Sequence, residues 1–151
     1  MSEFLDLHGR TSKLLRALSN RDVRRHGLHL GQDLVLSLLW ARDGQTPGEV
    51  ATALNVTTPT IVKMTTRMGT TGLLTRVRDS RDNRLVRLWL TDKGRSLRDP
   101  VEADRAALED VVTSDLTVDE RVCLIGALTK IQARAYRLLH PPADTPGRSR
   151  S

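Results

Sequence analysis

The stretch TRVRDSRDNRLVRLWLTDKG, residues Thr75–Gly94, decides the fold of this chain. On both sides of a charged centre, apolar and polar residues alternate with the period of two that is typical of β-strands. The centre is rich in Asp, Asn and Ser, whose side chains bind their own backbone and so favour turns. The sequence therefore predicts a two-stranded hairpin whose tip, Asp79–Arg84, mixes carboxylates with arginines.

The two kinds of charge at this tip have different expected roles. Each carboxylate lies within reach of an arginine, so the acids are expected to shape the loop and to hold the guanidinium groups outward. The alternative is a solvated loop with surface ion pairs worth under about 1 kcal/mol. The charged residues concerned are Arg78, Asp79, Arg81, Asp82 and Arg84.

Two short helices with a tight turn between them are predicted upstream of the hairpin. Thr46 and Glu49 have the spacing of a capping box, which starts a helix over Pro47–Leu54. A second helix is expected over Thr57–Thr71, with Thr57 as its cap. Two short helices joined in this way form a helix-turn-helix.

The second of these helices is expected to expose hydroxyls and cations. Threonine can bind phosphate, donate to a base edge or contact a thymine methyl group, and Lys or Arg can reach phosphate or guanine. This face suits a helix that lies in the major groove of DNA, although threonines on an exposed helix can also be merely solvated. Its residues are Thr57, Thr58, Thr60, Lys63, Thr66 and Arg67.

The charge of the chain also favours DNA as its partner. The net charge is +6, and residues 57–87 contain seven basic residues against two acidic ones. One fifth of the chain thus carries nearly all of the positive excess, which favours a polyanion. The sequence has no His-Glu-x-x-His, no phosphate-binding glycine loop, and no Ser or Cys with a nearby base, so we expect no catalytic residue and no enzymatic activity.

Long helices are predicted at both ends, over about residues 3–26 and 95–140. Each has apolar residues at alternating spacings of three and four, which produce a narrow seam that needs a partner. The C-terminal region is expected to begin with one long helix that Pro100 kinks or starts late. The fold class is mainly α with a small β-hairpin, in one unit spanning residues 1–140, and residues 141–151 have the composition of a disordered tail.

The combined pattern resembles the MarR family of winged-helix transcription regulators. The hairpin tip has the family's D-x-R-D-x-R pattern at Asp79–Arg84, followed by L-T-x-x-G at Leu90–Gly94. Upstream, GLHLGQDLVLSLL at Gly27–Leu39 and EVATALNVTTPTIVKMTTRMGTTGLLTR at Glu49–Arg76 resemble its helices. The chain differs at Thr66–Gly69, where the family often has Asp-Arg-Leu-Glu and the acid is absent here.

The resemblance implies a winged helix-turn-helix, about residues 30–94, between N- and C-terminal dimerisation helices. It implies a homodimeric repressor on a pseudo-palindromic double-stranded DNA site, with the helix from Thr57 in the major groove and Arg81 of the wing in the minor groove. Arginine there also has an independent reason, because a narrow A·T-rich minor groove concentrates negative potential. The alternative function is a chromatin-like protein that binds DNA without sequence preference.

The resemblance also leaves room for a small-molecule effector. Many relatives release DNA when a small, often phenolic, ligand fills a cleft beside the dimerisation helices. His8 and Trp40 are the candidate ligand contacts, and both could equally be packing residues. The lone Cys123 is expected to pack rather than to sense oxidants. No Cys or His pair has the spacing of metal ligands, so we expect neither a metal nor another cofactor.

The sequence also predicts where the protein works. The start MSEFLDLHGR has no stretch resembling a signal peptide, and the longest apolar run, around Leu34–Ala41, is too short to cross a membrane. We therefore expect a cytoplasmic protein without a membrane partner, associated with the nucleoid when bound to DNA. Trp89 alternates away from the apolar face of its strand, so it is expected to be partly exposed or covered by another element, such as a helix.

Overall fold

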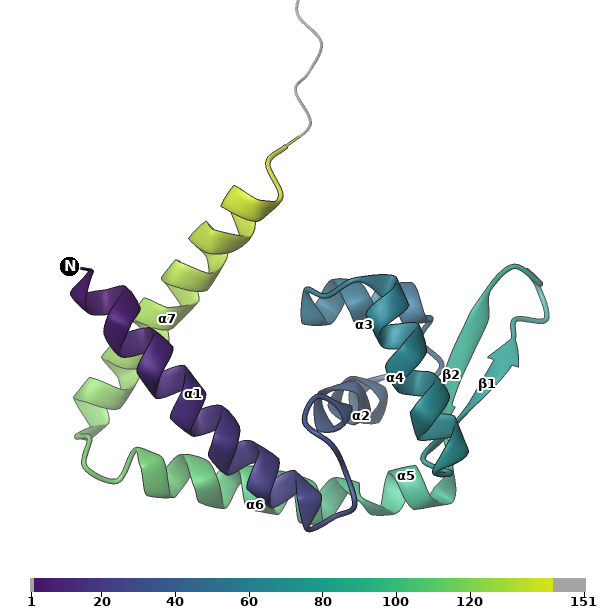
Figure 1. Cartoon of the computed structure of the whole chain (residues 1–151), viewed down its shortest axis with the longest axis horizontal. Coiled ribbons are helices and arrows are strands. Elements are labelled where there is room, and N and C mark those ends of the chain that lie inside the picture. The colour runs from purple at the N-terminus through teal and green to yellow at the C-terminus, as the bar shows by residue number, and fades with distance from the viewer. Residues whose placement is uncertain (1, 143–151) are drawn as a thin grey trace, which may run out of the picture. The chain divides into compact units, whose positions relative to one another are not determined.

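The computed structural model describes residues 2–142 and divides into two compact units, Met1–Glu109 and Asp110–Ser151. The described residues form helices and one hairpin, the mainly helical fold class that the sequence predicts (Figure 1). In chain order the elements are α1 (Glu3–Arg24), α2 (Gln32–Ala41), α3 (Pro47–Leu54), α4 (Thr58–Thr70), β1 (Leu74–Arg78), β2 (Val86–Leu90), α5 (Asp92–Ser96), α6 (Arg98–Val112) and α7 (Val118–Leu139).

The helix-turn-helix consists of α3 and α4, and its first helix starts as predicted. The Thr46 hydroxyl accepts the N–H of Glu49 at 3.2 Å, and a Glu49 carboxylate oxygen accepts the N–H of Thr46 at 2.8 Å. This capping box satisfies two amides that a helix start leaves unpaired. Asn55 then ends α3 with a φ of 55°, a left-handed conformation that Asn adopts more readily than most residues.

The start of α4 differs from the prediction in one respect. Thr57 occupies the N-cap position, but its side chain accepts no backbone N–H of the helix. Its hydroxyl instead lies 2.8 Å from the hydroxyl of Thr60, one turn later. Pro59 fits the first turn because an N–H there would have no partner within the helix. The predicted position of the cap is therefore confirmed, whereas the expected capping bond is absent.

The core of the first unit lies among α2, α3, α4 and the hairpin. In α4, Ile61 and Met68 are fully buried, and Met64 packs at the edge of the core. Thr65 is also fully buried, and its hydroxyl donates to the Ile61 carbonyl at 2.8 Å, so its polar group keeps a partner. The other buried apolar residues are Val23, Leu28, Val35, Leu36, Leu39, Val50, Ala51, Leu73, Leu74, Leu88, Leu90 and Val101.

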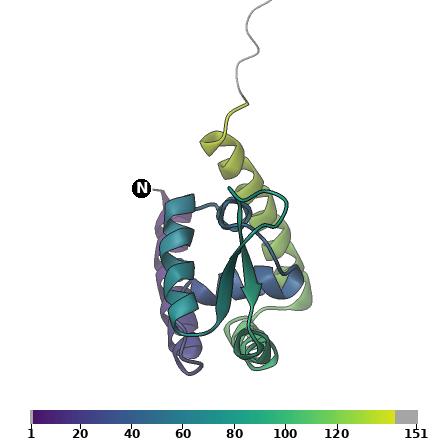
Figure 2. The ribbon, with the colours of Figure 1, turned by 90° about the vertical axis from the view of Figure 1, so that its right-hand side faces the viewer.

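The strands β1 and β2 form the predicted antiparallel hairpin (Figure 2). Leu74 pairs with Leu90 at its base, and Arg78 pairs with Val86 next to the tip. The loop between α2 and α3 joins β2 through one isolated bridge, in which the Leu88 N–H donates to the Gln45 carbonyl at 2.8 Å. The hairpin is therefore attached to the loop that precedes the helix-turn-helix.

The segment after the hairpin forms two helices rather than one. The short helix α5 is capped by Leu97, and Pro100 lies in the first turn of α6. Proline is tolerated there because first-turn N–H groups have no partner within the helix. Of the two effects expected of Pro100, the late start is confirmed, and the short helix α5 before it is an element that the sequence did not predict.

The second unit consists mainly of α7. Thr117 and Glu120 form a capping box at its start. No residue of α7 is buried within the chain, so its apolar seam is exposed. Of the tail predicted at 141–151, residues 143–151 lie outside the described part of the chain.

Candidate nucleic-acid interface

The six residues that the sequence assigns to the DNA-facing side of α4 are all exposed. Lys63 and Arg67 form no side-chain hydrogen bond or ion pair within residues 2–142, so both charges are available to a ligand. The Thr66 hydroxyl donates to the Val62 carbonyl at 2.7 Å and accepts from Arg76 of β1 at 2.7 Å. Thr66 therefore also connects the helix to the hairpin, which the sequence did not indicate.

The tip of the hairpin is an ordered turn built by its two carboxylates. One oxygen of Asp79 accepts the N–H of Arg81 at 2.7 Å and that of Asp82 at 3.1 Å. One oxygen of Asp82 accepts the backbone N–H of Arg84 at 3.1 Å and its Nε–H at 3.2 Å. Such bonds are those that Asp makes in turns. The acids thus shape the loop, as the sequence predicts.

The second oxygen of Asp79 forms an ion pair with Arg87 of β2. This bond, together with the two backbone N–H groups, lowers the pKa of Asp79 from 3.8 to about 2, and the same contact raises the pKa of Arg87. Arg87 also donates to the Gly44 carbonyl at 2.9 Å. One arginine therefore ties the turn to the loop between α2 and α3. From the sequence alone, Arg87 was included only in the net charge, because the residues that it bonds are not its neighbours along the chain.

The other three arginines of the tip differ in the hydrogen bonds and ion pairs that their side chains form. Arg78 donates to the Asn83 carbonyl at 3.3 Å, and Arg84 pairs with Asp82. Arg81 alone of the three forms no side-chain bond within the described residues. The turn therefore holds its backbone in place while leaving the Arg81 guanidinium available to DNA.

Comparison with known proteins places this geometry in one family. The sequence model of the MarR family matches residues 28–86. The transcriptional regulator MgrA of Staphylococcus aureus is 31% identical over 114 residues, which cover 76% of this chain and 76% of MgrA. The chain belongs to the MarR family. It is a DNA-binding transcriptional regulator of that family and not an enzyme.

Two further similarities extend beyond the segment that the family model matches. The regulator TtmR of Methylorubrum extorquens is 31% identical over 126 residues, and this match covers 81% of the present chain but only 64% of TtmR. Among solved structures, the transcriptional repressor CouR bound to a 23-mer DNA duplex is 31% identical with a TM-score of 0.78, over 83% of this chain and 89% of CouR. The MarR winged-helix fold with N- and C-terminal helices is thus the fold of this chain.

Trp89 packs against the same loop that Arg87 binds. A Cβ placed on Gly44 would come within 2.5 to 2.9 Å of the indole ring, so the ring covers this glycine, whose φ is +74°. Trp89 is nevertheless 41% exposed. Both interpretations from the sequence therefore hold in part, but a loop rather than a helix covers the ring.

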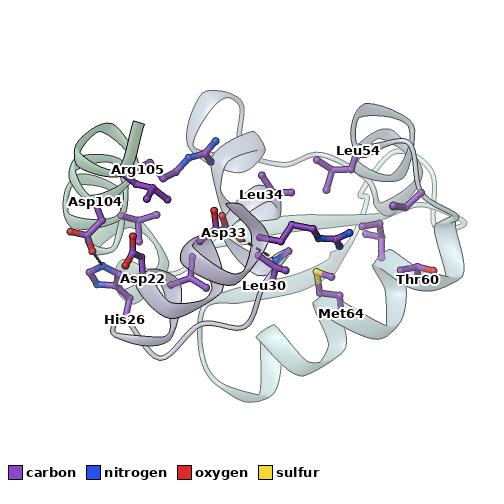
Figure 3. Close-up of a pocket in the computed structure, with 18 residues that line it drawn as sticks. Asp22, His26, Leu30, Asp33, Leu34, Leu54, Thr60, Met64, Asp104 and Arg105 are labelled. Atoms are coloured by element: carbon purple, nitrogen blue, oxygen red, sulfur yellow. Dashed lines mark hydrogen bonds and ion pairs between the residues drawn. The ribbon is translucent and has the colours of Figure 1, made fainter. Parts of the chain in front are cut away.

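The first unit of this MarR-family chain contains a cavity of about 480 Å³ lined by α1, α2, α3, α4 and α6. His26 and Asp104 pair at 2.7 Å at one end of it (Figure 3). The candidate ligand residues His8 and Trp40 do not line this cavity, and their assignment to a ligand site stays a prediction. His8 lies exposed on α1, and the Trp40 indole, which needs an acceptor when half-buried, donates to the Gly94 carbonyl at 2.9 Å.

The remaining expectations concern metals, membranes and the cysteine. Within residues 2–142, no group of three or more His, Cys, Asp or Glu side chains is placed to hold a metal ion. No helix in this same range is long and apolar enough to cross a membrane. Cys123 is exposed on α7 rather than packed, because no residue of that helix is buried within the chain.

Proposed function

We propose that this MarR-family chain is a homodimeric repressor that binds a pseudo-palindromic operator in double-stranded DNA, in the cytoplasm at the nucleoid. The distribution of unpaired charge carries the proposal. Lys63 and Arg67 on α4 and Arg81 at the wing tip have no side-chain partner within residues 2–142, whereas the tip carboxylates of Asp79 and Asp82 are bonded inside the turn. Unpaired cations on adjacent elements suit a polyanion whose phosphates release counterions on binding.

The helix α4 is the element that we assign to the major groove. Its exposed threonines can contact base edges and thymine methyl groups, and Lys63 and Arg67 can reach phosphate or guanine. The hydroxyls of Thr57 and Thr60 share a hydrogen bond, and that of Thr66 is bonded within the protein. The Thr58 hydroxyl is therefore the one most available to DNA. The assigned residues remain Thr57, Thr58, Thr60, Lys63, Thr66 and Arg67.

The hairpin acts as the wing, and Arg81 enters the minor groove. The arginines Arg78 and Arg84 are exposed beside it and are assigned to the flanking phosphates. Asp79 and Asp82 belong to the site as the groups that fix the turn rather than as direct DNA contacts.

Dimerisation is assigned to the terminal helices, about residues 3–26 and 95–140, around a winged helix-turn-helix at residues 30–94. Both α1 and α7 expose many large apolar side chains, more than a soluble monomer usually leaves in water. A second copy of the chain would cover them. These residues are Phe4, Leu5, Leu7, Leu14 and Leu15 on α1 and Val118, Val122, Leu124, Ile125, Leu128, Ile131, Tyr136, Leu138 and Leu139 on α7.

A charge placed in the seam of α1 tests the dimer. Leu14 is 66% exposed in the single chain, so Leu14→Glu should leave the fold of one chain intact. In a dimer it would remove about 2 kcal/mol of apolar burial for each copy and would bury a carboxylate. Light scattering should show monomers for Leu14→Glu and dimers for the neighbouring control, Lys13→Glu. An intact Leu14→Glu dimer would contradict the assignment of α1.

Sequence preference separates the repressor from a chromatin-like binder. The purified protein is used to select bound duplexes from a random pool, and the selected duplex is compared with a scrambled one. A regulator should prefer its palindrome by about a thousandfold or more. Equal affinity for both duplexes would favour the chromatin-like alternative.

The cavity is assigned to a small molecule that releases the DNA. Thr60, Ile61 and Met64 of α4 form part of its wall, so an occupant would contact the recognition helix directly. A ligand can shift the DNA equilibrium only if its affinity differs between the DNA-bound and free forms. Compounds that bind the protein and raise its melting temperature should therefore weaken operator binding. Compounds that bind but leave operator affinity unchanged would count against the cavity as an effector site.

A further inference from the structure

A second groove runs along α4 on the side that faces the loop between α1 and α2. Its volume is about 680 Å³, and its lining includes His29 from the loop and Lys63 and Arg67 from the helix. No carboxylate of residues 2–142 lines it, so these are its charged or chargeable side chains. The groove therefore offers an anion three basic side chains and no competing acid among the described residues.

The spacing along α4 explains why this groove is separate from the contact with the wing. Thr60, Lys63, Arg67 and Thr70 follow one another at intervals of three and four, so they form one stripe of the helix, and all four line the groove. Thr66 lies off this stripe and binds Arg76 of β1. The helix α4 thus has the wing on one flank and the loop that carries His29 on the other.

The backbone of this loop is already engaged, which leaves its imidazole as the group that can meet a ligand. The His29 N–H donates to the Gln32 side chain at 3.0 Å, and the Gln32 N–H donates to the His29 carbonyl at 3.0 Å. The Gly31 N–H donates to the Asp33 carboxylate at 3.1 Å. The His29 side chain is exposed and has no hydrogen-bond partner within the described residues.

We propose that His29, as an imidazolium, binds a backbone phosphate of the DNA strand that borders α4, together with Lys63 and Arg67. This inference rests on the proposed placement of α4 in the major groove. A helix in that groove has a phosphate backbone on each side, and contacts to phosphates fix its register. The loop between α1 and α2 is then a third DNA-contacting element beside α4 and the wing.

The proposal makes operator affinity depend on pH. Phosphate binding favours the charged form of a histidine side chain, so operator affinity should rise as the pH falls. Lys63 and Arg67 are the other basic side chains that line the groove. A pH dependence that belongs to this groove therefore comes from His29.

Fluorescence anisotropy with the duplex selected from the random pool tests the proposal at about pH 6 and about pH 8. The variants are His29→Gln, which is neutral at both values, and His29→Arg, which is charged at both. Both keep the backbone bonds of the loop. His140→Gln, at the end of α7, controls for the loss of a histidine elsewhere, and melting temperatures confirm that each variant is folded.

The wild type and His140→Gln should bind about fivefold or more tightly at the lower pH. His29→Gln should lose most of this gain, and its salt slope at the lower pH should fall by about 0.9 for each subunit. The operator affinity of His29→Arg at the higher pH should equal that of the wild type at the lower pH. A folded His29→Gln protein with the wild-type pH ratio and salt slope would overturn the proposal.

The same data separate this inference from the proposed function. If operator preference persists while His29→Gln behaves as the wild type, the phosphate contact is wrong and the regulator stands. If the selected and scrambled duplexes bind equally, sequence-specific regulation is wrong, and the pH ratio of His29→Gln still decides whether the loop meets DNA. Absence of DNA binding by the wild type would overturn both.

Discussion

Arg81→Ala should weaken operator binding without changing the stability of the fold. The Arg81 side chain forms no bond within residues 2–142, and the only bond of this residue to the turn comes from its backbone N–H, which alanine retains. Surface substitutions of this kind usually change the free energy of unfolding by less than about 0.5 kcal/mol. The loss of the guanidinium should therefore be visible in DNA binding alone.

The magnitude follows from counterion release. Each cation that neutralises a phosphate charge contributes about 0.9 to the slope of log affinity against log salt, so a dimer with two Arg81 side chains should lose about 1.8 from that slope. When the salt concentration rises from about 50 mM to about 200 mM, these two contacts account for about a twelvefold loss of wild-type affinity. The affinity of the variant should fall by about twelvefold less over the same range. The variant should therefore be weakest relative to the wild type at low salt.

The assay is operator titration at both salt concentrations, with a melting curve for each protein. Arg98→Ala is the matched control, because it also removes one exposed arginine, which pairs with Glu102 on α6 rather than with the wing. Arg98→Ala should keep the wild-type slope. If Arg81→Ala retains the wild-type affinity and slope, the wing does not place this residue on DNA. If its melting temperature falls, the view of Arg81 as a free side chain is wrong.

Two further predictions concern the fold that holds the wing. Gly94→Ala should lower the melting temperature by about 9 °C, because the added Cβ would collide with the Leu73 carbonyl oxygen at a cost of about 3 kcal/mol. The control is Gly48→Ala, whose Cβ has no neighbour nearer than 3.9 Å, and this variant should melt as the wild type does. Equal melting temperatures of the two variants would refute the clash. Asp79 has its pKa lowered to about 2 by Arg87 and by backbone N–H groups, so the stability it contributes is present above its ordinary value of 3.8 and is lost as the pH falls through about 2. Denaturation curves across this window should show a smaller acid-induced loss for Asp79→Asn than for the wild type, and an equal loss would contradict the ion pair.

The features that the sequence predicted well depend on residues close together in the chain. The capping box of Thr46 and Glu49 involves a separation of three residues, and the turn at the wing tip is built by Asp79 and its next neighbours. Proline restricts its own φ and lacks an N–H, so the type of Pro100 alone predicted either a kink or a late helix start, and α6 shows the late start. In each case the interaction is local, and the residue types suffice to specify it.

The features that the sequence missed depend on contacts between distant segments. Gly44 and Arg87 are 43 positions apart, and Trp40 and Gly94 are 54 apart, so neither hydrogen bond leaves a pattern in the sequence. Thr65 looked no different from the exposed threonines around it, because an internal bond to a backbone carbonyl satisfies its hydroxyl. The lining of the cavity beside α1 also left no pattern in the sequence, because packing decides which side chains face a cavity.

These distant contacts explain how the first unit holds the hairpin and α4 together. The hairpin is bonded on one side to the loop that precedes α3, where the Gly44 N–H donates to the Leu88 carbonyl at 3.0 Å. On the other side it is bonded to α4 itself, through Arg76 and Thr66. The wing cannot shift relative to α4 without breaking one of these bonds. In the proposed complex Arg81 would meet DNA from a backbone that the turn already holds in place, so less of the backbone has to be ordered on binding.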